Sequence, residues 1–196
     1  MQNNVVSLNI GKRIIDTVVA TALLSLLLPV IVLCGLWVRM TSPGSALYWS
    51  SRIGRNNQIF KMPKFRTMRI GTPAVATHLL ADANAYLTPI GGFLRKTSLD
   101  ELPQLWSVLK GDMSLVGPRP ALYNQDDLIT ARTVASIHML RPGITGWAQV
   151  NGRDELSIID KVGLDAEYLR KQSFTFDCYI LWLTVLKVLR RDGVSH

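Results

Sequence analysis

The sequence predicts an α+β fold that is predominantly helical, contains one small β-hairpin and begins with a membrane segment. Three observations lead to this prediction: an apolar run from Ile14 to Val38, two strand-like stretches flanking a Gly-Arg-Asn-Asn turn, and helical periodicity in much of the remainder. At 196 residues the chain has room for one modest domain besides the membrane segment. We expect the membrane segment over residues 1–40 and one body over residues 41–196.

The apolar run has two possible arrangements in a membrane. As a straight helix, Ile14–Val38 would be roughly 37 Å long, enough to cross a bilayer core of ~30 Å. Pro29 interrupts the hydrogen bonding near its middle, where the Ser25 hydroxyl lies close by. Positive charge flanks both ends, which favours placing both on the cytoplasmic side. The residues alone leave a kinked transmembrane helix and a helix-break-helix hairpin both open.

The expected elements of the body follow in order. Ala46–Ser51 and Gln58–Lys61 are predicted strands, joined by a hairpin turn at Gly54–Asn57. Three helices are expected, over Ala74–Tyr86, Asn124–Met139 and Phe174–Arg190. The last has a mixed apolar and basic pattern that suits either core packing or an interfacial helix at the membrane.

The charge distribution indicates an anionic partner. The formal net charge is +8, and no Asp or Glu occurs between Asp16 and Asp82, an interval that holds seven Lys and Arg residues. Nucleic acid, anionic lipid and phosphorylated small molecules all suit this balance. Cys34 and Cys178 form no disulfide framework or metal pair and are interpreted as inert thiols. The three histidines lack ligand spacing and receive no role.

Asp100 and Glu101 are the most informative pair of residues. They precede an amphipathic helix that ends at Gly111. Ser98 could cap this helix in a capping box. Pro103 would then occupy a position whose N–H should be hydrogen-bonded within the helix, and proline has no N–H. We therefore place the start at Asp100, where that position needs no donor. There the helix dipole would favour an ionised Asp100, and free N–H groups would favour a nearby phosphate. Two adjacent carboxylates could also hold Mg²⁺.

Taken alone, such a pair is usually a simple helix cap, so the surrounding cations decide the interpretation. Several lie in stiff proline- and glycine-containing segments that suit bidentate phosphate contacts. These cations are Lys64, Arg66, Arg69, Arg95, Lys96, Arg119 and Arg141. No Walker A loop, GxGxxG, HExxH or GxSxG motif is present. The residues therefore indicate an enzyme that handles phosphate around two carboxylates.

Four contiguous motifs resemble one known family. They cover Lys64–Met68, Thr97–Trp106, Lys110–Pro120 and Arg141–Arg153. Together they are similar to the bacterial sugar transferases, the monotopic phosphoglycosyl transferases, in their minimal catalytic form. The resemblance extends from about Lys12 to the last predicted helix.

This resemblance implies a reaction. Such enzymes move a phosphosugar from a UDP-sugar to undecaprenyl (polyprenol) phosphate and release UMP, the first membrane step of glycoconjugate synthesis. It implies that Asp100 is the nucleophile that takes the phosphosugar, and that Glu101 assists and shares Mg²⁺ with it. The implied substrate-binding residues are Lys64, Arg66, Arg95, Arg119, Arg141 and Gln149. Asp165 and Tyr168 fit the family's closing Asp-x-x-Tyr pattern.

The resemblance also implies a location and partners. It favours a re-entrant helix-break-helix around Ser25 and Pro29, anchored in the bacterial cytoplasmic membrane with the body facing the cytoplasm. The partners would be the UDP-sugar, the polyprenol phosphate and membrane lipid, not nucleic acid, and a homodimer stays open. The alternative function is a non-catalytic basic module that binds anionic lipid or nucleic acid at the membrane. Neither the sugar nor the glycan pathway is encoded in a recognisable motif.

Overall fold

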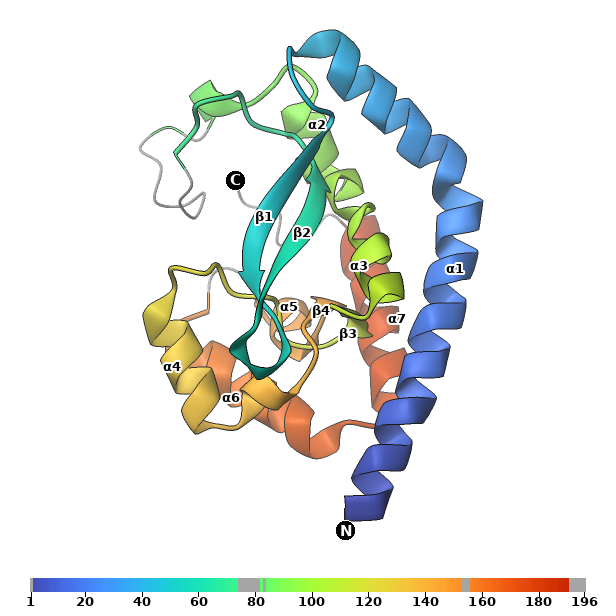
Figure 1. Ribbon diagram of the computed structural model, residues 1–196, viewed down its shortest axis with the longest axis vertical. Coiled ribbons are helices and arrows are strands. Elements are labelled where there is room, and N and C mark those ends of the chain that lie inside the picture. The colour runs from blue at the N-terminus through green and yellow to red at the C-terminus, as the bar shows by residue number, and fades with distance from the viewer. Residues whose placement is uncertain (1, 74–81, 83, 153–155, 191–196) are drawn as a thin grey trace.

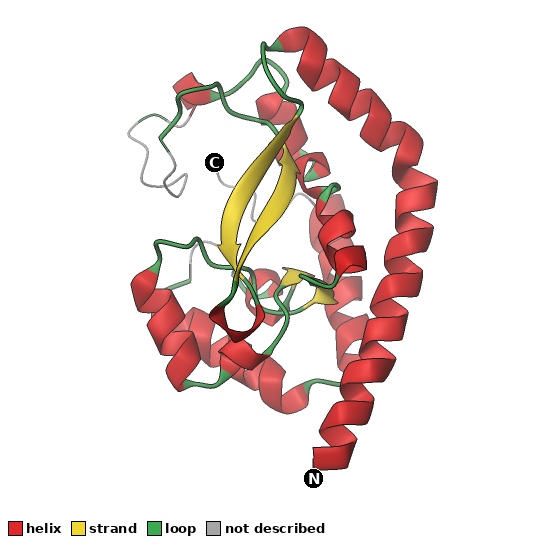
Figure 2. Cartoon of the chain, viewed as in Figure 1, coloured by secondary structure: helices red, strands yellow, loops and turns green. Residues whose placement is uncertain are grey.

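The computed structural model describes residues 2–73, 82, 84–152 and 156–190, and these form a mostly helical body with a central hairpin (Figures 1 and 2). The helices are α1 (Gln2–Thr41), α2 (Gly91–Lys96), α3 (Gln104–Lys110), α4 (Asp126–Val134), α5 (Trp147–Val150), α6 (Ile158–Lys171) and α7 (Phe174–Arg190). The strands are β1 (Leu47–Ile53), β2 (Ile59–Phe65), β3 (Ser114–Val116) and β4 (Gly143–Thr145). Short 3₁₀ turns are η1 (Arg55–Asn57), η3 (Asn84–Tyr86), η4 (Leu99–Glu101) and η5 (Ile137–Met139). The predicted α+β, mainly helical class is confirmed.

The predicted hairpin is confirmed and is longer than expected. β1 and β2 pair antiparallel, with Leu47 opposite Phe65 and Ile53 opposite Ile59. Alternate side chains of β2, including Phe60 and Met62, are buried in the core, as the period of a strand requires. The prediction ended the second strand at Lys61, but pairing continues through Pro63, which an edge strand tolerates. This extension places Lys64 on a paired strand rather than in a loop.

A second, parallel sheet pairs β3 with β4 and was not predicted. Each strand has only three residues, too few to show a period in the sequence. The backbone is closely packed around Gly143. A Cβ added there would stand 2.1 Å from the Gly117 nitrogen and 2.3 Å from the Thr145 oxygen. Glycine is therefore required at this contact, which fixes the loop that leaves β3.

Residues 2–41 form one continuous helix, so the structure does not confirm the expected helix-break-helix hairpin. α1 stays helical through Pro29, and its ribbon bends along its length instead of turning back (Figure 1). A proline inside a helix removes one hydrogen bond and bends the helix without necessarily ending it. Ser25 and Pro29 are both exposed, and no hydrogen bond among the described residues uses the Ser25 hydroxyl.

One face of α1 packs against the body along most of its length. Asp16, Ala20, Cys34 and Val38 are buried, at spacings that return to the same side of a helix. The first half contacts the main core, and the second half contacts a smaller cluster around Phe65 and Leu94. The opposite face is exposed and apolar.

Asp16 fastens the first half of α1 to β3. Its carboxylate accepts hydrogen bonds from the Ser114 hydroxyl at 2.7 Å and from the Leu115 nitrogen at 3.2 Å, and its side chain is 6% exposed. We expect Asp16→Ala to lower stability by about 2 kcal/mol, because both buried donors lose their partner. Thermal unfolding in detergent should show a Tm about 4–8 °C lower. Thr21→Val, on the exposed side of the same helix, is the control, and an equal loss there would contradict this anchoring role.

The remaining helix predictions have different outcomes. Most of Ala74–Tyr86 lies outside the described residues, and only η3 is seen at its end. Asn124–Met139 is divided into α4 and η5, because Ser136 adopts a left-handed conformation with φ of 60°. Phe174–Arg190 is confirmed as α7, which buries Ile180 and exposes Trp182.

Candidate active site

Asp100 and Glu101 lie in a short turn, not at the start of the helix. η4 spans Leu99–Glu101, and α3 begins after Pro103. Pro103 has no N–H and cannot continue the helical hydrogen-bond pattern. The Leu102 N–H donates to the Leu99 carbonyl and ends the turn, whereas the Trp106 N–H donates to the Pro103 carbonyl in the first turn of α3. The predicted start at Asp100 is therefore wrong. The predicted end is confirmed, because Gly111 caps α3 with φ of 97°.

This geometry changes the electrostatic argument for Asp100. A turn of three residues has no substantial dipole, so it cannot hold the carboxyl ionised as we expected. Asp100 is 8% exposed, and burial raises its pKa above the ordinary value. Lys64 lowers that pKa most among the neighbouring charges, Glu101 raises it, and Arg95 and Arg119 lower it further. The nearby cations therefore offset part of the cost of ionising a buried nucleophile candidate, and burial remains the larger effect.

Glu101 is held by two cations from distant parts of the chain. The Lys64 Nζ donates to Glu101 Oε1 at 2.7 Å, and Arg119 Nη2 donates to the same oxygen at 3.2 Å. Lys64 comes from β2, whereas Arg119 follows β3 in the glycine- and proline-rich loop. The Glu101 and Lys64 side chains are 13% and 16% exposed, so this is a partly desolvated pair.

Arg95 completes the cationic surroundings of Asp100. It lies on α2, and its Nε donates to the Thr67 hydroxyl at 3.0 Å. Burial lowers the pKa of its guanidinium, and the charge of Asp100 raises it. The structure thus brings together Asp100 and Glu101 with Lys64, Arg95 and Arg119, five of the residues predicted from the sequence.

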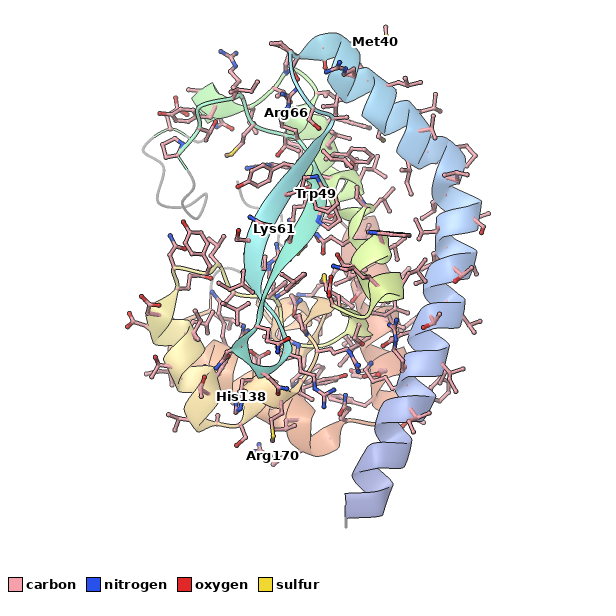
Figure 3. All side chains as sticks on the ribbon, in the orientation of Figure 1. Met40, Trp49, Lys61, Arg66, His138 and Arg170 are labelled. Atoms are coloured by element: carbon pink, nitrogen blue, oxygen red, sulfur yellow. The ribbon has the colours of Figure 1, made fainter. Side chains whose placement is uncertain are left out.

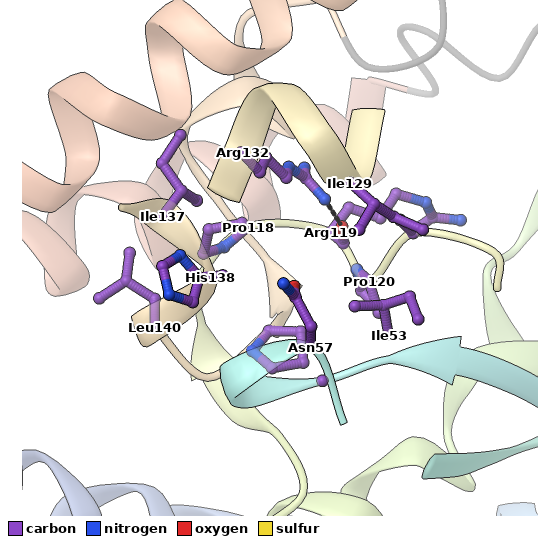
Figure 4. A pocket seen from close by; sticks show the side chains of 13 residues that line it. Ile53, Asn57, Pro118, Arg119, Pro120, Ile129, Arg132, Ile137, His138 and Leu140 are labelled. Carbon is purple, nitrogen blue, oxygen red and sulfur yellow. Dashed lines mark hydrogen bonds between the residues drawn. The ribbon is translucent and has the colours of Figure 1, made fainter. Parts of the chain in front are cut away.

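The loop that carries Arg119 is held in place by residues of α4 and α6. Arg132 donates to the Arg119 carbonyl at 2.7 Å (Figure 4) and pairs with Asp165 through two nitrogens at 2.6 and 3.0 Å. Asp165 is 1% exposed, so burial raises its pKa, and Arg132 lowers it. Arg132 was missed by the sequence analysis, since nothing marks an isolated arginine in a helix as a positioning residue.

Tyr168 supports the same loop from one turn further along α6. Its hydroxyl donates to Asp177 Oδ1 at 2.7 Å and lies 3.1 Å from the Val116 carbonyl, a second acceptor. Asp165 and Tyr168 are therefore close to the site, but they hold the backbone instead of facing the acidic pair. Between this loop, η1 and η5 lies a small cavity whose lining includes Ile53, Asn57 and His138 (Figure 4).

Three other predicted site residues are not brought to the acidic pair. Arg66 is buried near the end of α1 (Figure 3), where its guanidinium donates to the Ser42 and Pro43 carbonyls and the Ser42 hydroxyl. Arg141 donates from Nε to the Gly111 carbonyl at 3.1 Å, at the far end of α3. The Gln149 carboxamide is buried without a hydrogen-bond partner among the described residues. It lies beside Gly146, which connects β4 to α5.

The donor set fits a divalent cation bound jointly with substrate. The described residues contain no group of three His, Cys, Asp or Glu side chains that could hold a metal. Asp100 makes no side-chain hydrogen bond among those residues and sits beside Glu101. Mg²⁺ commonly takes one or two carboxylates and completes its shell with water and phosphate oxygens. Asp100 and Glu101 supply this partial set.

Comparison with known proteins finds one family across almost the whole chain. The family model described as "Bacterial sugar transferase" matches residues 7–191. The UDP-glucose:undecaprenyl-phosphate glucose-1-phosphate transferase of Escherichia coli K12 is 40% identical over 183 residues, covering 90% of this chain and 39% of that protein. The UDP-galactose-lipid carrier transferase of Erwinia amylovora is 38% identical over 197 residues, covering 93% and 41%.

A shorter relative covers a larger share of its own length. The sugar transferase EpsL of Bacillus subtilis 168 is 42% identical over 185 residues, covering 94% of this chain and 90% of EpsL. By contrast, this chain spans about two fifths of the length of the Escherichia coli and Erwinia amylovora relatives.

Proposed function

The chain belongs to the bacterial sugar transferase family, and we propose that it transfers a phosphosugar from a UDP-sugar to undecaprenyl phosphate with release of UMP. The names of two relatives describe transfer between a UDP-sugar and undecaprenyl phosphate or a lipid carrier. The observation that carries the proposal is the buried Asp100, which lies beside Glu101 among Lys64, Arg95 and Arg119. A non-catalytic basic module would give no role to this costly arrangement.

The arrangement suits two successive displacements at one phosphorus atom. An Asp100 oxygen attacks the sugar-bearing phosphorus of the donor, the bond to the bridging oxygen breaks, and UMP leaves. An oxygen of the undecaprenyl phosphate then attacks the same phosphorus, and the bond to Asp100 breaks to restore the carboxylate. Lys64, Arg95 and Arg119 offset the negative charge that gathers on the phosphoryl oxygens in both steps.

Glu101 has a separate task in this scheme. Its carboxylate is fixed by Lys64 and Arg119, so it can orient these cations toward the phosphates and assist the acceptor phosphate. Mg²⁺, when bound by Asp100 and Glu101, would supply shielding between the carboxylate nucleophile and the anionic donor. These roles explain why a second carboxylate is tolerated next to the first.

We also propose that α1 enters the membrane from one side only. Ile10–Thr41 is long and apolar enough to cross a bilayer. Yet Asp16 and Val38, both packed on the body, are 22 residues apart, which is about 33 Å along a helix. A perpendicular span would therefore draw the body into the hydrocarbon core. A bent, re-entrant α1 with its basic ends at the cytoplasmic surface avoids this.

The exposed apolar side chains support this membrane placement. On α1 they include Leu26, Leu33 and Met40, exposed by 74%, 64% and 84%, and Figure 3 shows Met40 pointing away from the body. On α7, Trp182, Val185 and Val188 are also exposed. Such large apolar faces are unusual on a soluble monomer. We infer that both helices contact lipid, with α7 at the interface.

The reaction is tested by measuring UMP release with undecaprenyl phosphate, Mg²⁺ and a panel of UDP-sugars. We expect UMP release that requires both the acceptor and one of the UDP-sugars. The other product should be a lipid-linked diphosphosugar. Release of UDP instead of UMP would indicate transfer of the sugar without its phosphate and would contradict the proposal. The preferred sugar is identified in the same measurement.

Lys64 should set the pH range of the reaction. Lys64→Met removes the largest pKa-lowering charge on Asp100, so the Asp100 pKa rises and the carboxylate becomes protonated at higher pH. We expect the acid limb of the kcat/KM profile to move to higher pH, and kcat/KM at pH 7 to fall about 10–100-fold. Lys61→Met is the control, because Lys61 is exposed on the same strand (Figure 3). If the acid limb of Lys64→Met lies at the same pH as that of the wild type, the prediction that Lys64 lowers the Asp100 pKa is contradicted.

A further inference from the structure

A second cluster of positive charge lies at the opposite end of α3 from the acidic pair. A cleft there is lined by Lys12 and Arg13 of α1, Arg55 of η1, and Arg141 before β4, together with Asp16 and Gln172. We call it the arginine cleft, after Arg13, Arg55 and Arg141. Asp100 precedes α3 and Gly111 ends it, so the length of this helix, about 10 Å, separates the two charge clusters.

The arginine cleft has more positive than negative charge. Lys12 is paired with Asp177, which leaves three guanidinium groups around the single carboxylate of Asp16. Burial lowers the pKa of Arg141, the charges of Arg55 and Arg13 lower it further, and Asp16 raises it. These like charges are close enough to repel one another, and a bound anion would relieve that repulsion.

Two of the arginines have donors that no other described residue accepts. Arg13 directs both Nη groups at the Val108 and Leu109 carbonyls, so it mainly clamps α1 to α3. Arg55 and Arg141 each use only Nε, which donates to the Met139 and Gly111 carbonyls at 2.9 and 3.1 Å. Among the described residues no hydrogen bond uses their Nη groups. A planar fork of N–H donors of this kind matches a phosphate.

The apolar side chains around the arginine cleft indicate which class of phosphate-containing molecule would bind there. Ile10 and Ile14 flank the basic residues of α1 and are each 59% exposed, and Met139 in the lining is 49% exposed. These apolar side chains lie where α1 enters the proposed membrane interface. We propose that the arginine cleft binds the phosphate group of an anionic phospholipid. This inference rests on the proposed membrane placement and not on the catalytic scheme.

The test is direct binding to the purified full chain in a neutral detergent. The probes are short-chain phosphatidylglycerol, short-chain phosphatidylcholine and inorganic phosphate, titrated separately at a fixed salt concentration and followed by native mass spectrometry. Arg55→Gln is the main variant, because Arg55 lies in an exposed turn. Arg170→Gln is the matched control, since Arg170 is exposed on α6, outside the cleft lining (Figure 3).

We expect saturable binding of phosphatidylglycerol, weakened about fivefold in Arg55→Gln and unchanged in Arg170→Gln. Arg141→Gln should weaken it at least as much, and its unfolding temperature reports whether losing the Gly111 contact disturbs the fold. Equal binding by wild type and Arg55→Gln would overturn the proposal. Phosphatidylcholine or inorganic phosphate binding as tightly as phosphatidylglycerol would also overturn it, because the site would then not select an anionic lipid. UMP release is not measured, so failure here leaves the catalytic proposal untouched.

Discussion

Asp100→Asn should lose at least about 10³-fold in turnover, because it replaces the attacking oxygen with a poor nucleophile of the same shape. The measurement is UMP release with the preferred UDP-sugar and undecaprenyl phosphate. Donor binding should persist, since Lys64, Arg95 and Arg119 are unchanged. Asp127→Asn, an exposed carboxylate on α4, is the control and should keep wild-type turnover. Turnover of Asp100→Asn within tenfold of wild type would contradict the nucleophile role.

The same variant should be more stable than wild type above the folded-state pKa of Asp100. Burial raises that pKa, so the ionised carboxylate opposes folding at neutral pH, and asparagine removes this cost. We expect a Tm about 2–4 °C higher at neutral pH, for a gain of about 1 kcal/mol. The difference should vanish as the pH falls toward the unfolded pKa, where Asp100 is protonated in both states. A Tm gain that persists at low pH would assign the effect to packing.

Asp165→Ala should cause the largest loss of stability, about 3–5 kcal/mol. Arg132 would then keep its charge while its side chain is 11% exposed and has lost both nitrogen contacts to Asp165. We expect Tm to fall by roughly 10 °C in thermal unfolding. UMP release should also fall, because Arg132 positions the carbonyl of Arg119.

A double variant separates the two effects of Asp165→Ala. Replacing the pair by apolar residues, Arg132→Met with Asp165→Leu, leaves no buried charge and should recover part of the lost stability. UMP release should stay low, because Arg132→Met removes the donor to the Arg119 carbonyl. Recovery of full activity in the double variant would show that Arg132 has no positioning role. Asp127→Ala is the surface control and should change Tm by no more than about 2 °C.

The elements that the sequence predicted well are those with a local signal. The hairpin has a turn flanked by strand-forming residues, and α3 ends at Gly111, the glycine that was predicted to stop it. The parallel pairing of β3 and β4 has no such signal, because it joins two three-residue segments 29 positions apart through close backbone contact at Gly143. Long-range contacts of this kind leave little trace in periodicity.

The start of the α3 region shows how a correct observation led to a wrong geometry. Pro103 does prevent a regular helix from Ser98, as we reasoned, but the chain responds with a separate 3₁₀ turn instead of a later helix start. Asp100 is consequently controlled by burial and cations, not by a helix dipole. The acidic pair was identifiable from the sequence, whereas the groups that set the Asp100 pKa were not.

The arginines show the limit of reasoning from motifs. Lys64, Arg95 and Arg119 surround the acidic pair, but Arg66 closes the turn after α1 and Arg141 faces the arginine cleft. All five lie in or beside the motifs that were singled out in the sequence, so composition could not separate them. Only the three-dimensional structure shows which of them surround the acidic pair, which one makes a structural contact and which one lines the arginine cleft.

The proposed reaction passes through a covalent phosphosugar on Asp100, which intact mass spectrometry can detect. The purified protein is incubated with Mg²⁺ and the preferred UDP-sugar in the absence of undecaprenyl phosphate, then quenched, weighed and digested. We expect a mass increase equal to one phosphosugar, located on the peptide that contains Asp100 and discharged when undecaprenyl phosphate is added. Turnover without any adduct, or an adduct that survives in Asp100→Asn, would contradict it.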